Sequence, residues 1–240
     1  LHNGRRRQRQ MCIRDSQGIT ADLGMRLVTI PNESPDVAEC ERITPEILAE
    51  YLDEDVAFVC VQIVNYRSGA RQDVPALTAT ARDHGAYVLW DASHAVGSID
   101  LRFDEWGVDI AVGCTYKYCN SGPGSPAWMY VRSDLQDTLR TPIDGWFGQK
   151  DQFTMGPTFE RASGMRGFQI ASPSIVGLTA VEESMSIIAE AGMNRIGAKC
   201  AEGTSFMIDL FDQWLGPLGF SLDTPRSCLL YTSPSPRDNR

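Results

Sequence analysis

Three side chains that can do chemistry follow short apolar runs in the chain. Asp91 directly follows Val88-Leu89-Trp90, His94 lies three residues later, and Lys117 comes after the run 109–113. If these runs are neighbouring strands of a parallel sheet, their carboxyl ends meet at one edge, where ligands bind in such folds. A lysine and a carboxylate there suit pyridoxal phosphate (PLP), because the amine bonds to the cofactor aldehyde and the carboxylate keeps the pyridine nitrogen protonated. The plainer alternative is a pair of exposed polar residues at the starts of two loops.

The runs that must position these residues have the composition of buried strands. Residues 56–63 are continuously apolar and rich in β-branched side chains, as is typical of a strand buried on both faces. We predict further strands over 86–90, 109–113 and 127–131, and one upstream over Arg26–Ile30.

Helix signals lie between these strands. Thr44-Pro45-Glu46 opens a helix with proline in its first turn, and a short helical turn is expected near 103–106. Asp73 is predicted to cap a helix that runs to about His84 and ends at Gly85.

The pattern changes after Arg132. Apolar residues recur at helical spacing from Ser174 to about Glu190 and from Met193 to about Leu215, so we expect a pair of long helices separated by Gly192. Together with the alternating strands and helices upstream, this predicts an α/β fold in one domain, with a mostly parallel sheet flanked by helices.

The two ends of the chain carry residues that we expect to be foreign to the protein. Residues 10–15 and 228–233 back-translate into one DNA segment read in opposite orientations, as a sequencing adapter on both sides of an insert would give. The alternative is a basic arm and a Ser/Pro-rich tail. We therefore predict adapter-derived scars over 1–16 and 227–240, the central part of a PLP-binding large domain over 17–190, and over 191–226 a helix leading toward a missing C-terminal small domain.

Without these ends the chain is strongly acidic. The sequence has 22 Lys+Arg and 31 Asp+Glu, for a net charge of −9, and removing 1–16 and 227–240 leaves 15 and 29, for a net charge of −14. The arginine cluster near the start disappears with the first segment, and an acidic surface repels phosphate backbones. We therefore expect no nucleic-acid partner.

Cysteine usage and hydropathy indicate the surroundings in which the protein works. Five cysteines lie between residues 17 and 226, an odd number without CxxC spacing, which argues against a disulfide framework or a zinc site. We therefore expect no metal and a reducing, cytoplasmic location. No stretch approaches the roughly 18 apolar residues of a membrane span, so we expect no membrane partner.

Ordered motifs along the chain resemble the kynureninase family of PLP enzymes. Asp-x-x-His and a lysine alone would fit many relatives with the aminotransferase fold. The block Tyr-Lys-Tyr-x-Asn-x-Gly-Pro-Gly around Lys117, with a later Trp-Phe-Gly, is what points to kynureninase. The matching segments are 64–69, 90–97, 106–109, 113–124, 145–148 and 171–173.

The resemblance implies the large domain of a PLP fold type I enzyme, incomplete at both ends, and roles for several residues. Lys117 would bond to PLP and then move the substrate α-proton, while Asp91 would pair with the pyridine nitrogen. The other implied cofactor contacts are His94 beside the ring, Tyr116 near the phosphate and as a candidate proton donor, and Trp146 and Ser172 at the phosphate of a neighbouring subunit's cofactor. Gln62 stands where relatives place a small hydroxyl residue near PLP, Ser172 where they often carry Asn or Thr, and Gln149 where they commonly show His.

The activity implied by the resemblance is hydrolysis of L-kynurenine, or its 3-hydroxy form, to an anthranilate and L-alanine. The resemblance also implies a homodimer with shared active sites. In the family an upstream segment holds the phosphate and a downstream domain holds the substrate carboxylate, and both lie outside residues 17–226. We therefore expect activity in a longer parent protein and none in this chain alone.

Two alternatives remain open at this point. Another PLP enzyme of the same fold, such as a cysteine desulfurase or a class V aminotransferase, would share Asp91 and Lys117. A desulfurase needs a nucleophilic cysteine on a mobile loop, whereas Cys114 and Cys119 flank the lysine inside its motif. The other alternative is a truncated fragment with no function of its own.

Overall fold

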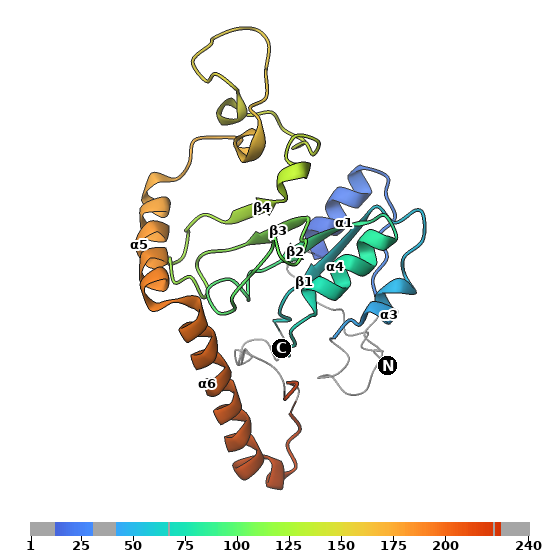
Figure 1. Cartoon of the computed structure of the whole chain (residues 1–240), viewed down its shortest axis with the longest axis vertical. Helices are drawn as coiled ribbons and strands as arrows, with labels where there is room; N and C mark the ends of the chain where they lie inside the picture. The colour runs from blue at the N-terminus through green and yellow to red at the C-terminus, as the bar shows by residue number, and fades with distance from the viewer. Residues whose placement is uncertain (1–12, 31–41, 67, 223, 227–240) are drawn as a thin grey trace, which may run out of the picture.

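The chain folds around a four-stranded sheet in a computed structural model that describes residues 13–30, 42–66, 68–222 and 224–226. The strands are β1 (Phe58–Gln62), β2 (Tyr87–Asp91), β3 (Ile110–Gly113) and β4 (Trp128–Val131), in the spatial order β1-β2-β3-β4 (Figure 1). β1, β2 and β3 are parallel, and β4 is antiparallel to β3. The four predicted strands around the lysine and aspartate are therefore confirmed. The outermost strand on one side, β4, is antiparallel.

Helix α4 (Val74–Asp83) provides the buried cover for one face of this sheet. Asp73 caps it by accepting the Ala76 backbone N–H at 3.1 Å, and the chain leaves it at His84, as predicted. Leu77 packs with the strands in the core, and the indole N–H of buried Trp90 donates to Thr78 Oγ1 at 3.0 Å. This hydrogen bond fixes β2 against α4 and so fixes the strand that ends in Asp91.

A buried carboxylate connects β2, β3 and β4. It lies at the start of β3, at the end of the sheet opposite to Asp91. Asp109 accepts the Val88 backbone N–H at 3.1 Å and the Arg132 guanidinium at 2.7 Å, with Arg82 at 3.4 Å. Because a buried charge is costly unless it is paired, these partners explain how Asp109 is accommodated in the core.

The N-terminal part differs from one prediction. Helix α3 (Pro45–Ala49) begins after Thr44, whose side chain accepts the Ile47 N–H, as expected. The predicted strand over Arg26–Ile30 is wrong, because in the described structure these residues have no neighbouring strand to pair with and Val28 remains exposed. Helix α1 (Ile13–Asp22) runs across the predicted boundary at residues 16 and 17, and most of both predicted scars lies outside the described residues.

After β4 the chain forms several short turns and then two long helices. After short 3₁₀ turns at Ser133–Leu135, Trp146–Gly148 and Gly164–Phe168 come α5 (Ile175–Ala191) and α6 (Met193–Trp214), and another 3₁₀ turn at Gly216–Leu218. Both helices are confirmed, with Gly192 between them at φ 81°. They run on from one another along one side of the molecule rather than folding back as a hairpin (Figure 1). Within the described residues, no helix is long and apolar enough to cross a membrane.

Candidate active site

The candidate site lies where β1 and β2 end side by side. Gln62 and Asp91 are register partners at the carboxyl ends of these parallel strands. Asp91 is 4% exposed, and one carboxylate oxygen accepts the Ser93 backbone N–H at 2.9 Å. The turn after β2 therefore orients this carboxylate and holds it at the sheet edge.

Lys117 and His94 meet at the same edge, as the sequence predicted for neighbouring strand ends. Lys117 Nζ lies 3.1 Å from His94 Nε2, although 23 residues separate them in the chain. The His94 ring stacks on Tyr66, with centroids 6.4 Å apart and planes at 29°. Tyr66 has a place in the motifs but no predicted role, and its position just after β1 is the signal that identifies it as a residue of the strand-end site.

The electrostatics keep His94 uncharged near neutral pH. Burial first and the charge of Lys117 second lower the pKa of His94 to about 4, against an opposing effect of Asp91. A neutral ring leaves a lone pair on Nε2 that can accept a hydrogen bond from the Lys117 ammonium. The lysine amine therefore has a hydrogen-bond acceptor beside it and a carboxylate nearby.

The loop that carries Lys117 is shaped by close backbone packing. Gly97 lies against it, and a Cβ added there would come within 2.6 Å of the Tyr118 carbonyl group. The Thr115 hydroxyl donates to the Pro126 carbonyl oxygen at 2.6 Å, and the Ser121 N–H donates to the Thr115 carbonyl oxygen at 3.1 Å. These contacts hold the segment between β3 and β4 in one conformation.

Tyr116 lies beside the lysine and is 45% exposed. The Lys117 ammonium lies 5.7 Å from the centre of its ring. Burial, followed by the neighbouring Cys114, raises the pKa of the Tyr116 phenol. Tyr116 therefore keeps its proton at neutral pH beside Lys117.

The side chain of Gln62 is buried at the end of β1. Its side chain is 4% exposed, and neither amide atom has a partner among the described residues. On the same face of β1, the pKa of Cys60 is raised to about 11, first by burial and then by the charge of Asp91. A buried polar group without a partner indicates a ligand or another group missing from the surroundings.

These residues fit PLP. A primary amine suits the aldehyde, a buried carboxylate suits the ring nitrogen, and an unpaired amide adds a polar contact at the same edge. Among the described residues, no group of three or more His, Cys, Asp and Glu side chains is arranged to hold a metal.

Two other predicted site residues, Trp146 and Ser172, make no contact with the lysine. Trp146 is 51% exposed, its indole N–H donates to the Gln152 carbonyl oxygen at 2.6 Å, and its ring meets Phe153 edge to face. Ser172 is exposed just before α5. Because β4 is antiparallel to β3, the chain leaves the sheet at the edge opposite to Asp91, which takes Trp146 away from Lys117.

Gln149, which the sequence left without a role, has a local structural one. Its side-chain oxygen accepts the Glu160 N–H at 2.9 Å, and its backbone pairs with Arg161. The Arg166 guanidinium donates to its carbonyl oxygen at 3.3 Å. Gln149 therefore closes the loop that follows Trp146.

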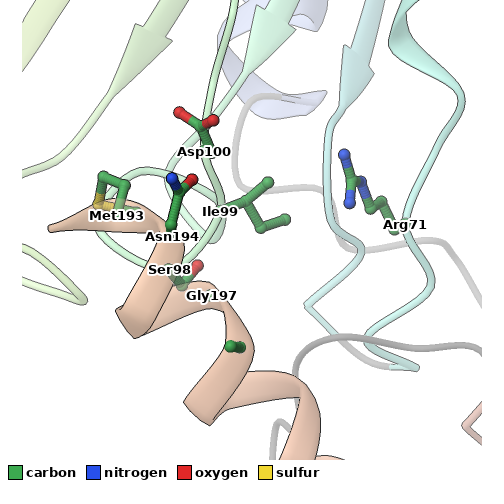
Figure 2. Close-up of a pocket in the computed structure, with 8 residues that line it drawn as sticks. Arg71, Ser98, Ile99, Asp100, Met193, Asn194 and Gly197 are labelled. Atoms are coloured by element: carbon green, nitrogen blue, oxygen red, sulfur yellow. The ribbon is translucent and has the colours of Figure 1, made fainter.

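A separate hollow of about 230 Å³ lies between the turn after β2 and the start of α6 (Figure 2). Its lining includes Arg71, Ser98, Asp100 and Asn194, and none of the predicted site residues. We place the site at the sheet edge because the amine, the carboxylate and the imidazole come together there.

Comparisons with known proteins agree with this geometry. The sequence pattern of the family described as aminotransferase class-V matches residues 17–216. A kynureninase of Pseudomonas fluorescens is 36% identical over 183 residues, which cover 76% of this chain and 44% of the relative. A kynureninase of Burkholderia mallei is 33% identical over 216 residues, 88% of this chain and 49% of the relative. The chain thus spans about half the length of the curated relatives it matches.

Solved structures show the same fold at lower identity. The apo cysteine desulfurase of Thermococcus onnurineus superposes with a TM-score of 0.64 at 20% identity, covering 83% of this chain and 48% of that chain. A C-DES mutant with glycine covalently linked to its PLP cofactor has a TM-score of 0.69 at 18% identity, covering 84% and 52%. The predicted aminotransferase-like α/β fold is confirmed, and PLP is supported as the cofactor. The chain belongs to the aminotransferase class-V family.

Proposed function

We propose that these residues form part of a PLP enzyme that hydrolyses kynurenine or 3-hydroxykynurenine to the corresponding anthranilate and alanine. The observation that carries the proposal is the meeting of Lys117, His94 and Asp91 at one sheet edge. The two kynureninases at 36% and 33% identity support this substrate class. The active form would be a longer parent protein, because the chain spans about half of those relatives.

Lys117 and Asp91 have separate tasks in this proposal. Bound PLP would supply an electron-accepting ring that stabilises negative charge at the substrate carbon next to the amino group. Lys117 would hold the cofactor and then take the proton from the substrate carbon that bears the amino group. Asp91, oriented by the Ser93 N–H, would hold a proton on the ring nitrogen and so favour charge entering the ring.

His94 and Tyr116 would manage protons around the lysine. Neutral His94 accepts a hydrogen bond from Lys117, which keeps the amine in place without adding a second positive charge. Tyr116 retains its proton and would donate it to the carbon fragment that becomes alanine.

We further propose a homodimer in which Trp146 and Ser172 reach the partner's cofactor. Their exposure and their distance in the fold from the lysine support a role outside their own chain. Helix α5 also carries exposed apolar side chains, including Val176 at 85%. An uncovered apolar surface of this kind is typical of an interface.

Cysteine desulfurase activity is the second candidate, since enzymes of that name share the fold. A desulfurase needs an accessible, readily ionised thiol near the cofactor. Cys119 is buried and its pKa is raised by burial, and the pKa of Cys60 is raised to about 11. Cys60 and Cys119 are therefore poor nucleophiles, and Cys114, which is partly buried, has its Sγ 3.9 Å from the Ser93 carbonyl oxygen. The burial of these thiols favours hydrolysis of a carbon–carbon bond over desulfuration.

The test uses the parent protein with PLP. Borohydride reduction followed by peptide mapping should place the pyridoxyl mass on Lys117, and kynurenine should yield anthranilate. Lys150 and Lys199 are the internal controls, because neither lies in the site. Label on either of them would overturn the assignment of the lysine, and sulfur release from cysteine without anthranilate would favour the second candidate.

A further inference from the structure

Trp146 and Ser172 are distant in sequence, but the backbone brings their segments together. A Cβ added to Gly145 would collide with the backbone of Ile170, and such close approach requires glycine. The residue before Trp146 therefore lies directly against the chain two residues before Ser172. The two side chains proposed to reach the partner's cofactor thus belong to one packed unit, the segment 141–172, which extends past β4 as a separate lobe in Figure 1.

One guanidinium connects this unit to the rest of the fold. Arg161 Nε donates to the Gly167 carbonyl oxygen and Nη1 donates to the Gln136 carbonyl oxygen, both at 3.2 Å. The guanidinium also lies over the Phe168 ring, 4.7 Å from its centre. Because a planar guanidinium presents its donors in a fixed geometry, Arg161 holds the turn 164–168 against the chain that follows β4.

The contact at Gln136 leads into the core of the sheet. The Gln136 side chain donates to the carbonyl oxygen of Val131, the last residue of β4, at 2.8 Å. The neighbouring Leu135 is buried and packs with Val131 and Ile110. Arg161 therefore ties the segment 141–172 to a well-packed part of the sheet.

The main chain at Arg161 also closes the loop that begins at Trp146. Its backbone pairs with that of Gln149, three residues after Trp146. One residue therefore contacts both the loop that carries Trp146 and the turn that precedes Ser172. We propose that Arg161 is a positioning residue that places Trp146 and Ser172 for the phosphate of the partner's cofactor, an inference that rests on the proposed function.

The first experiment compares PLP with pyridoxal, which lacks the phosphate, in the dimeric parent protein. Arg161→Leu should weaken PLP binding by about tenfold and leave pyridoxal binding unchanged, because misplaced donors lose charge-assisted hydrogen bonds to the phosphate alone. Trp146→Ala should show the same selective loss. Absorbance titration of the cofactor-free protein measures both dissociation constants. A residue that only stabilised the fold would change both.

Arg166→Leu is the matched control. Arg166 lies in the same segment, but it is exposed and its guanidinium donates to the Gln149 carbonyl oxygen rather than to the chain after β4. Its removal should leave both dissociation constants unchanged. If Arg161→Leu folded poorly, Arg161→Lys would replace it, since lysine keeps the charge but lacks the fork that bonds two carbonyl groups. An equal loss for PLP and pyridoxal, or no loss, would overturn the inference.

The second experiment uses mixed dimers to test on which chain Arg161 acts. Two dimers, purified with a different tag on each chain, both contain one Lys117→Ala and one Arg161→Leu substitution. With the substitutions on separate chains, the remaining Lys117 faces a partner with an intact Arg161, so PLP affinity should equal that of a wild-type site. With both on one chain, the remaining Lys117 faces the altered partner, and PLP affinity should fall by about tenfold.

The PLP that borohydride fixes on the remaining Lys117, measured at increasing PLP concentrations, reports these affinities. Because the two dimers carry the same substitutions, a general loss of stability affects both alike. Equal affinities would overturn the inference that Arg161 acts on the partner's cofactor. A wild-type parent protein that bound no PLP would instead overturn the proposed function itself.

Discussion

Predicted site residues lie in two regions that the fold holds in different ways. One is the sheet edge at the carboxyl ends of the parallel strands, with Asp91, His94 and Lys117, and the other is the segment 141–172. At the sheet edge, strand pairing brings residues from three parts of the chain together, and Asp91 is 4% exposed. In the segment 141–172, Trp146 is 51% exposed and its indole N–H bonds to a carbonyl only six residues away. Parallel pairing positions groups that are distant in sequence, whereas local turns orient only their own neighbours.

This difference indicates which parts of the proposed site the chain assembles by itself. Lys117 and His94 are already in contact, and the charge of Asp91 acts on His94. Trp146 and Ser172 lack contacts with them, so they need another surface before they can act on a cofactor. Variants at the two regions should therefore fail in different ways.

The largest effect is expected at the sheet edge. Asp91→Asn in the parent protein should retain PLP but lower kcat by about 10²–10³-fold, because an amide cannot hold a proton on the ring nitrogen as a carboxylate does. Steady-state kinetics with kynurenine, alongside cofactor absorbance, would measure this. A variant with near-normal kcat would rule out Asp91 as the partner of the ring nitrogen.

A smaller effect tests whether the segment 141–172 acts across subunits. Trp146→Ala and Lys117→Ala should each be impaired alone. After subunit exchange between the two variants, about one quarter of wild-type activity should return, because each mixed dimer has one complete site under two-fold symmetry. Native mass spectrometry should verify the exchange before activity is measured.

The outcome separates two arrangements. If Trp146 acts at the cofactor of its own chain, neither chain of a mixed dimer carries both Lys117 and Trp146. Activity then stays at the level of the unmixed proteins. That result, with exchange verified, would contradict the shared-site proposal and leave the sheet-edge assignments unaffected.

A third effect concerns stability against pH in the cofactor-free protein. His94 has a folded pKa of about 4 against an ordinary 6.5, so between these values the unfolded state binds more protons. Its contribution to stability is therefore complete above about pH 6.5 and is lost as the pH falls through about 4. His94→Asn should flatten the decline of melting temperature over this window.

The exposed His84 at the end of α4 offers the control. His84→Asn should leave the slope of melting temperature against pH close to that of the wild type. Equal slopes for wild type and His94→Asn would show that another group accounts for the acid sensitivity.

The smallest effect concerns the helix that supports β2. Asp73→Ala should lower the free energy of unfolding by about 1 kcal/mol, because the Ala76 N–H loses its cap. Urea unfolding would measure it, with Asp83→Ala at the other end of α4 for comparison. Equal losses in both variants would point to a general charge effect rather than the cap.

Local patterns predicted most of the secondary structure. The cap at Asp73, the helix start at Thr44 and the break at Gly192 were predicted from residues whose backbone preferences act within one turn. The strand over Arg26–Ile30 failed, because strand formation requires a neighbour that the apolar composition cannot specify. The orphaned amide of Gln62 was equally invisible, since a lack of partners exists only in three dimensions.

The sequence by itself determined the α/β alternation, the family resemblance and the choice of Asp91, His94 and Lys117. Each depends on residue type and short spacing, which local physics governs. Only the tertiary structure decided that His94 lies against Lys117, that Gln62 is buried beside Asp91, and that Trp146 lies away from both. Strand order and direction decide those proximities, and they arise from packing among residues far apart in the chain.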